Sequence, residues 1–96
     1  MSVEFIYVNH SIPDSCALAI HTPAGVVIQT GDYKVDYTPT RGGIIDLARF
    51  GELGREGVLA LLADSTNVER AGYTPSENTV AEGLDRQFKN CDQRII

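Results

Sequence analysis

Apolar and polar positions along the first third of the chain predict three β-strands. Residues 3–9 are mostly apolar and are followed by His10, which indicates a strand that runs out into a loop. Residues 16–21 and 26–30 are two further apolar runs. The short loop between them, residues 22–25, contains a proline and a glycine, and such a loop between two strands is typical of a β-hairpin. We therefore expect a strand followed by an antiparallel hairpin.

A helical pattern and then a second strand pattern follow the hairpin. Apolar residues recur at helical spacing in residues 46–53, which predicts a short helix that stops at Gly54. Residues 58–63 form an unbroken apolar run of the kind found in strands that are covered on both faces. We therefore expect a central strand at residues 58–63.

The last part of the chain predicts another helix. Thr74, Pro75 and Glu77 fit a capping box, with Thr74 as the N-cap, Pro75 at the first helical position and Glu77 reaching back to the cap. The helix should continue to about Asn90, and residues 94–96 resemble the beginning of a strand. This order of strands and helices is typical of an α/β fold, a sheet with helices packed over it.

Composition indicates one small globular domain. The chain has 96 residues, of which 43% are hydrophobic and 22% charged, and this balance excludes a disordered chain. The longest apolar run is far shorter than the roughly 20 residues that cross a bilayer, and no secretory signal is visible, so we expect a cytoplasmic protein without a membrane partner. Cys16 and Cys91 lack CxxC spacing, which argues against a thiolate zinc site or a disulfide framework, and Cys16 is expected to be a buried thiol.

The formal charge of −5 disfavours a nucleic-acid binder of the basic-patch kind. It does not exclude an enzyme that grips phosphates through metal ions, because carboxylate-rich sites recruit divalent cations that then supply the positive charge. The basic residues are too scattered for a phosphate track and are expected to be solvated: Lys34, Arg41, Arg70 and Arg94.

His10 and Asp32 are the first candidate site residues. Taken alone, His10 can be a polar residue at a strand end and Asp32 a turn carboxylate. However, Asp32 comes 22 residues after His10, each follows a predicted strand, and the hairpin between them can bring both strand ends to one edge of the sheet. Imidazole and carboxylate are the ligands of hydrolytic divalent-metal sites, although a catalytic zinc needs three protein ligands. His21, in the hairpin, is expected to be a structural or surface residue.

Asp64 is the third candidate, because it follows the apolar run 58–63 and precedes Ser65, Thr66 and Asn67. Two interpretations remain open. The carboxylate can close the strand with an Asx-type turn. Alternatively, it can orient a catalytic histidine supplied from elsewhere, fixing the tautomer and raising the basicity of the imidazole.

Three segments together resemble a known family. They are residues 8–15 (VNHSIPDS), 30–36 (TGDYKVD) and 63–70 (ADSTNVER), and in this order and spacing they closely resemble ribonuclease J, of the β-CASP branch of the metallo-β-lactamase fold. The resemblance covers essentially the whole chain. It implies that residues 1–68 are the C-terminal half of a metallo-β-lactamase αββα sandwich and residues 69–96 the start of a β-CASP domain, so that the chain is incomplete as a domain.

The resemblance also implies a function: a two-metal ribonuclease that degrades RNA from the 5′ end and also cuts internally. It implies that His10 binds one metal, that Asp32 bridges two divalent ions (Zn²⁺, with Mn²⁺ or Mg²⁺ as alternatives), and that Asp64 supports a catalytic histidine. RNA would be the partner of a full-length, homo-oligomeric enzyme. The family's main metal motif, His-x-His-x-Asp-His, is absent from the 96 residues, so we expect the chain alone to be inactive.

Two alternatives stand beside this interpretation. The chain can be a non-catalytic interaction module that pairs an exposed sheet edge with a full-length enzyme. It can also be a metallo-β-lactamase relative that hydrolyses small esters, lactams or thioesters, although the Asp64 segment and the helix after it argue against this.

Overall fold

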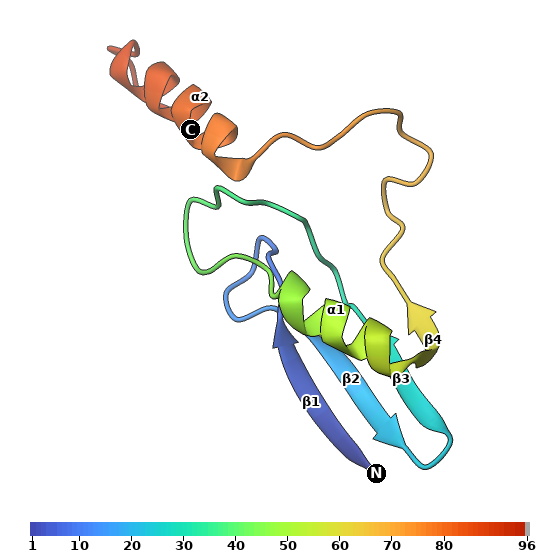
Figure 1. Ribbon diagram of the computed structural model, residues 1–96. Helices are drawn as coiled ribbons and strands as arrows, with labels where there is room; N and C mark the ends of the chain where they lie inside the picture. The colour runs from blue at the N-terminus through green and yellow to red at the C-terminus, as the bar shows by residue number, and fades with distance from the viewer. Residues whose placement is uncertain (96) are drawn as a thin grey trace.

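The computed structural model describes residues 1–95, which form a four-stranded sheet, a helix packed on one face, and a second helix at the end of a long connection (Figure 1). This confirms the expected α/β class. The elements are β1 (Ser2–Tyr7), β2 (Cys16–Thr22), β3 (Gly25–Gln29), α1 (Leu47–Glu56), β4 (Val58–Leu62) and α2 (Glu77–Lys89). The division of the chain between residues 68 and 69 stays a prediction.

The sheet has the strand order β1-β2-β3-β4. β2 is antiparallel to both of its neighbours, whereas β4 is parallel to β3. The predicted hairpin is confirmed, and its turn is fixed by Thr22, whose Oγ1 donates to the carbonyl of Gly25 at 2.8 Å and accepts from the N–H of Ala24 at 3.2 Å. Because β1, β3 and β4 run in the same direction, their C-terminal ends meet at one edge of the sheet.

The core lies between α1 and one face of the sheet. Alternate residues of each strand point to this face, as the two-residue period of a strand requires, and Leu53 of α1 is fully buried against them. The buried apolar residues are Ile6, Val8, Ala17, Ala19, Ile28, Ile45 and Leu53.

The expectation of a central strand at residues 58–63 is wrong. Within residues 1–95 β4 is an edge strand, and its side chains Leu59, Leu61 and Leu62 are about 60% exposed (62%, 61% and 59%). Phe5 on β1, at the other edge, is 71% exposed. An unbroken apolar run indicates that both faces of a strand favour burial, but it does not specify what covers them.

α1 begins as expected and ends later than expected. The Asp46 side chain caps it by accepting from the N–H of Arg49 at 2.9 Å. Gly54 does not stop the helix. α1 continues to Glu56, and its C-cap Gly57 has φ +106° and donates its N–H to the carbonyl of Leu53 at 3.0 Å. A glycine inside a helix costs only about 1 kcal/mol, whereas the positive φ at residue 57 favours glycine.

α2 begins two residues later than the capping-box pattern predicts. Ser76 is the N-cap and accepts from the N–H of Asn78 at 3.2 Å, so Thr74 is not the cap. The reason is tertiary, because Ser76 and Glu77 both contact the distant residue Asp36. The predicted end is confirmed, with Asn90 as the C-cap.

The remaining expectations concern the termini, the cysteines and the membrane. Arg94 and Ile95 are not in a strand, and Ile96 lies outside the described residues. Cys16 opens β2 but is half-buried rather than buried, because its side chain shares the uncovered sheet face with Phe5. Neither α1 nor α2, within residues 1–95, has the length and apolar character needed to cross a lipid bilayer.

Candidate active site

The three candidate site residues follow three strands that end at the same edge of the sheet. His10 comes after β1, Asp32 after β3 and Asp64 after β4. The expectation that the hairpin brings His10 and Asp32 together is confirmed, because His10 Nε2 lies 3.6 Å from Asp32 Oδ2. This edge is where open α/β sheets commonly carry their chemistry.

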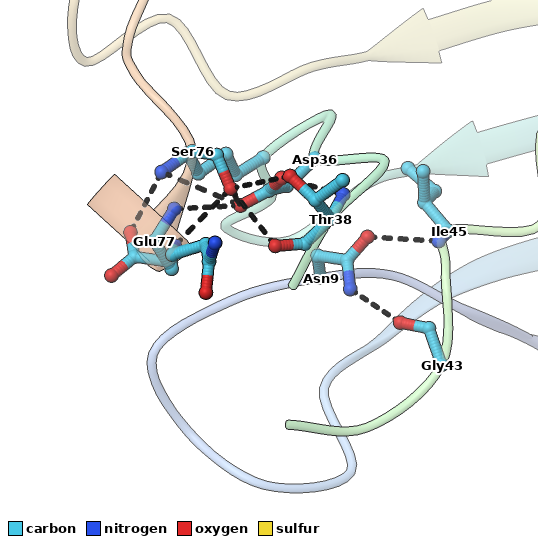
Figure 2. A network of polar contacts seen from close by, with 9 residues as sticks. Asn9, Asp36, Thr38, Gly43, Ile45, Ser76 and Glu77 are labelled. Carbon is cyan, nitrogen blue, oxygen red and sulfur yellow. Dashed lines mark hydrogen bonds and ion pairs between the residues drawn. The ribbon is translucent and has the colours of Figure 1, made fainter. Parts of the chain in front are cut away.

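Asn9 fixes the backbone next to His10. Its side chain is buried, with Nδ2 donating to the carbonyl of Gly43 at 2.6 Å and Oδ1 accepting from the N–H of Ile45 at 2.8 Å (Figure 2). Its own carbonyl accepts from the N–H of Lys34 at 2.8 Å. Sequence reasoning missed this role, although an amide side chain at the end of an apolar strand was a usable signal.

Thr30 joins the loops that carry the two carboxylates. Its N–H donates to the carbonyl of Leu62 at 3.0 Å, and its Oγ1 accepts from the N–H of Asp64 at 3.0 Å. Asp32 and Asp64 consequently line one pocket of about 250 Å³ between the ends of β3 and β4. Sequence reasoning also missed Thr30, which is buried.

Asp64 closes β4 with an Asx-type turn. Its Oδ1 accepts from the Thr66 hydroxyl at 2.5 Å and from the Thr66 N–H at 2.9 Å. These two hydrogen bonds, the hydroxyl first, hold the pKa of the Asp64 carboxyl below its usual range, so it is ionised at neutral pH. The structural interpretation of Asp64 is confirmed, and its role beside a catalytic histidine stays a prediction.

Several known proteins are similar in sequence to this chain. No protein-family profile matches the chain. Ribonuclease J of Synechocystis sp. is 53% identical over 94 residues, that of Helicobacter pylori 49% over 94 residues, and that of Thermus thermophilus 45% over 95 residues. These alignments cover 98%, 98% and 99% of the chain. The chain matches a segment of ribonuclease J. It spans only 15%, 14% and 17% of the length of these curated relatives.

The pair of donors formed by His10 and Asp32 fits a shared metal ion. Two ligands on one tetrahedral Zn²⁺, each about 2.0–2.2 Å from it, lie roughly 3.4 Å apart, close to the 3.6 Å between His10 and Asp32. Their side chains are 30% and 73% exposed, so the position is open to solvent. Within residues 1–95 no three His, Cys, Asp or Glu side chains gather in a metal-binding group. A complete centre therefore needs donors from outside the described residues.

The structure also bears on the expectations for His21 and Lys34. His21 is structural, as expected, because its Nε2 lies 3.1 Å from Glu4, which also pairs with Arg49 at 2.6 Å. Lys34 is not solvated as expected; its side chain is 18% exposed and its Nζ lies 2.7 Å from Glu77 Oε1. The loop after β3 folds back on α2, and local sequence does not reveal such a contact.

Proposed function

We propose that this chain is part of a metal-dependent ribonuclease of the metallo-β-lactamase fold, β-CASP branch. The observation that carries the proposal is the His10–Asp32 pair at the edge where β1, β3 and β4 end. Support also comes from the relatives, which bear the name ribonuclease J and are 45% to 53% identical along the chain. In this proposal residues 1–68 form the second half of the metallo-β-lactamase domain and residues 69–96 lead into the β-CASP domain.

The proposal gives each site residue a task. His10 Nε2 and the Asp32 carboxylate would hold divalent ions, Zn²⁺ first, with Mn²⁺ or Mg²⁺ as alternatives. Such ions, when bound, lower the pKa of water and stabilise charge on a phosphoryl group. Asp64, ionised by its contacts with Thr66, would hold the imidazole of a histidine from outside the described residues in one tautomer.

The chain alone should show little or no nuclease activity, because two donors do not complete a catalytic metal site. The purified chain is incubated with Mn²⁺ or Zn²⁺ and with RNA that carries a 5′-monophosphate. Absence of degradation is the expected result, whereas robust metal-dependent degradation would overturn this part of the proposal.

The roles of His10 and Asp32 are tested in a chimera in which this chain replaces the matching stretch of the Synechocystis ribonuclease J. We expect His10→Ala and Asp32→Ala each to lower kcat/KM at least about a hundredfold, because a lost ligand removes several kcal/mol of transition-state stabilisation. Bound metal, measured by elemental analysis, should fall as well. His21→Gln is the matched control and should leave both quantities unchanged. Full activity of the His10→Ala chimera would contradict the proposal.

A second candidate function, the non-catalytic interaction module, is favoured by the uncovered apolar side chains of the edge strands, such as Phe5 and Leu59. It predicts that the chain forms a stable complex with a full-length ribonuclease J in size-exclusion chromatography. Lack of such a complex would exclude it. The small-substrate hydrolase gains no support from the relatives described above, which are all named ribonuclease J.

A further inference from the structure

Asp36, in the loop after β3, is a buried carboxylate with a side chain only 3% exposed. Its Oδ2 accepts from the backbone N–H of Glu77 at 2.8 Å and lies 3.1 Å from the Ser76 hydroxyl, while its Oδ1 accepts from the N–H of Thr38 at 3.0 Å (Figure 2). The Lys34 ammonium lies 3.9 Å from Oδ2. Asp36 is therefore the centre of a polar network that includes the first turn of α2.

This network joins α2 to the rest of the chain. Asp36 and Glu77 are 41 residues apart in sequence. No residue of α2 is buried, and its apolar side chains Val80, Leu84 and Phe88 are exposed. Within residues 1–95, the hydrogen bonds and ion pairs between this helix with its N-cap and the loop after β3 all involve Ser76 or Glu77.

The same loop is anchored at the candidate metal centre. Asp32 lies four residues before Asp36. Between them, the N–H of Lys34 donates to the carbonyl of Asn9 at 2.8 Å, directly beside His10. One short segment thus contacts the neighbour of His10, carries Asp32 and holds the start of α2.

We propose that Asp36 is a positioning residue that fixes the first turn of α2 against this loop, and thereby sets where the chain beyond α2 lies relative to His10 and Asp32. Two physical effects make a carboxylate suitable. It accepts the free N–H at the helix start and interacts favourably with the positive end of the helix dipole. Its two oxygens also accept from two different segments, so losing Asp36 leaves the partly buried N–H groups of Thr38 and Glu77 unpaired. The role of Asp36 in positioning α2 does not depend on the proposed function. Any effect of Asp36 on RNA cleavage rests on the proposed function.

Two substitutions act on the contact from opposite sides: one weakens the acceptor at residue 36, and the other removes the N–H of residue 77. Asp36→Asn keeps the shape of the side chain but replaces an acceptor oxygen with an NH₂ group. Glu77→Pro removes the N–H that Asp36 accepts, and proline is tolerated at the first position of a helix. Ser76, the residue before it, has φ −59° and ψ 148°, which suits a residue that precedes proline. Glu77→Ala is the matched control, because it removes the ion pair with Lys34 and keeps the N–H.

Hydrogen–deuterium exchange of residues 78–90, followed by mass spectrometry in the 96-residue chain and in the chimera described above, reads out the position of α2. A helix of 13 residues without tertiary contacts is marginal in water. Asp36→Asn and Glu77→Pro should therefore each accelerate exchange of residues 78–90 about tenfold. Exchange of residues 16–29 should not change, and Glu77→Ala should have a clearly smaller effect.

Unchanged exchange of residues 78–90 in both Asp36→Asn and Glu77→Pro would overturn the proposal, and so would an equal effect of Glu77→Ala and Glu77→Pro. In the chimera, Asp36→Asn should raise KM for RNA about tenfold while leaving the bound metal unchanged, a split that general unfolding would not produce. A wild-type chimera without nuclease activity would count against the proposed function and leave the exchange result to decide the role of Asp36.

Discussion

α1 and α2 are both amphipathic helices, yet different forces hold them in place. α1 buries Leu53 against the sheet and is tied to β1 by the ion pair between Arg49 and Glu4. α2 buries no residue within the described chain and is attached at its first turn by polar contacts with Asp36. The comparison shows that an apolar stripe fixes a helix only where an apolar partner surface covers it. Where no such surface is present, polar contacts with a buried carboxylate can position the helix.

Leu53→Ala is expected to have the largest effect, because it leaves a cavity in the core between α1 and the sheet. Such substitutions cost about 2–5 kcal/mol, a large share of the stability of a domain of this size. Urea unfolding followed by circular dichroism measures the loss. Leu84→Ala on α2 is the matched control, since Leu84 is 55% exposed, and it should cost less than about 0.5 kcal/mol. Similar losses for both variants would show that α2 is packed as tightly as α1.

Asn9→Ala should come next, because it removes a partly buried hydrogen bond to Gly43 and a buried one to Ile45 from the region that holds His10. Leaving these backbone groups unpaired costs about 1–3 kcal/mol. Thermal unfolding gives the size of the effect, with Asn67→Ala, at an exposed position, as the control. A loss no larger than that of the control would mean that Asn9 does not support the site.

Gly57 and Gly54 test where α1 ends. Gly57→Ala should destabilise the chain by about 1 kcal/mol, because φ +106° is strained for any residue with a Cβ. Gly54→Ala should instead stabilise it by about 0.5–1 kcal/mol, because Gly54 lies inside α1 and an added Cβ meets no atom within 4 Å other than those of its chain neighbours and the local helix backbone. Unfolding midpoints of the two variants should therefore move in opposite directions. The reverse order would restore Gly54 as the end of the helix.

Elements that depend on local pattern were predictable from the sequence, and elements that depend on distant contacts were not. The hairpin and the core face of α1 follow from short-range spacing and turn residues. The start of α2 was misplaced at Thr74 because Asp36, far away in sequence, holds Ser76 and Glu77. A capping box is a local signal, and here a tertiary contact determines the outcome.

The same difference between local pattern and distant contacts applies to the candidate site. Local sequence was enough to place His10, Asp32 and Asp64 at strand ends, and the strand directions then bring them to one edge. The supporting roles of Asn9 and Thr30 were not predicted, because their partners are backbone groups on other segments. Apart from the amide side chain of Asn9 at the end of an apolar strand, contacts with backbone groups leave no pattern of residue types in the sequence.

A change of pH should give the smallest difference in stability between the regions around α1 and α2. The reason is that single carboxyl groups contribute little to the free energy of unfolding. The Arg49 guanidinium, followed by His21, lowers the pKa of Glu4 from its usual 4.5 to about 2, and the N–H of Glu77 lowers the pKa of Asp36. A carboxyl whose pKa is lower in the folded state stabilises the fold above its unfolded pKa, and this contribution disappears as the pH falls toward the folded value.

Unfolding midpoints should thus decrease as the pH falls from about 5 to about 2. Glu4→Gln should flatten this decrease for the sheet and α1. Asp36→Asn should flatten, in α2 alone, the acid-induced loss of protection, measured as the exchange rate relative to that of the unfolded chain at the same pH. Glu52→Gln, which removes only the more exposed partner of Arg49, serves as the control. If Glu4→Gln retained the full decrease, the ion pair with Arg49 would not contribute to holding α1 against β1.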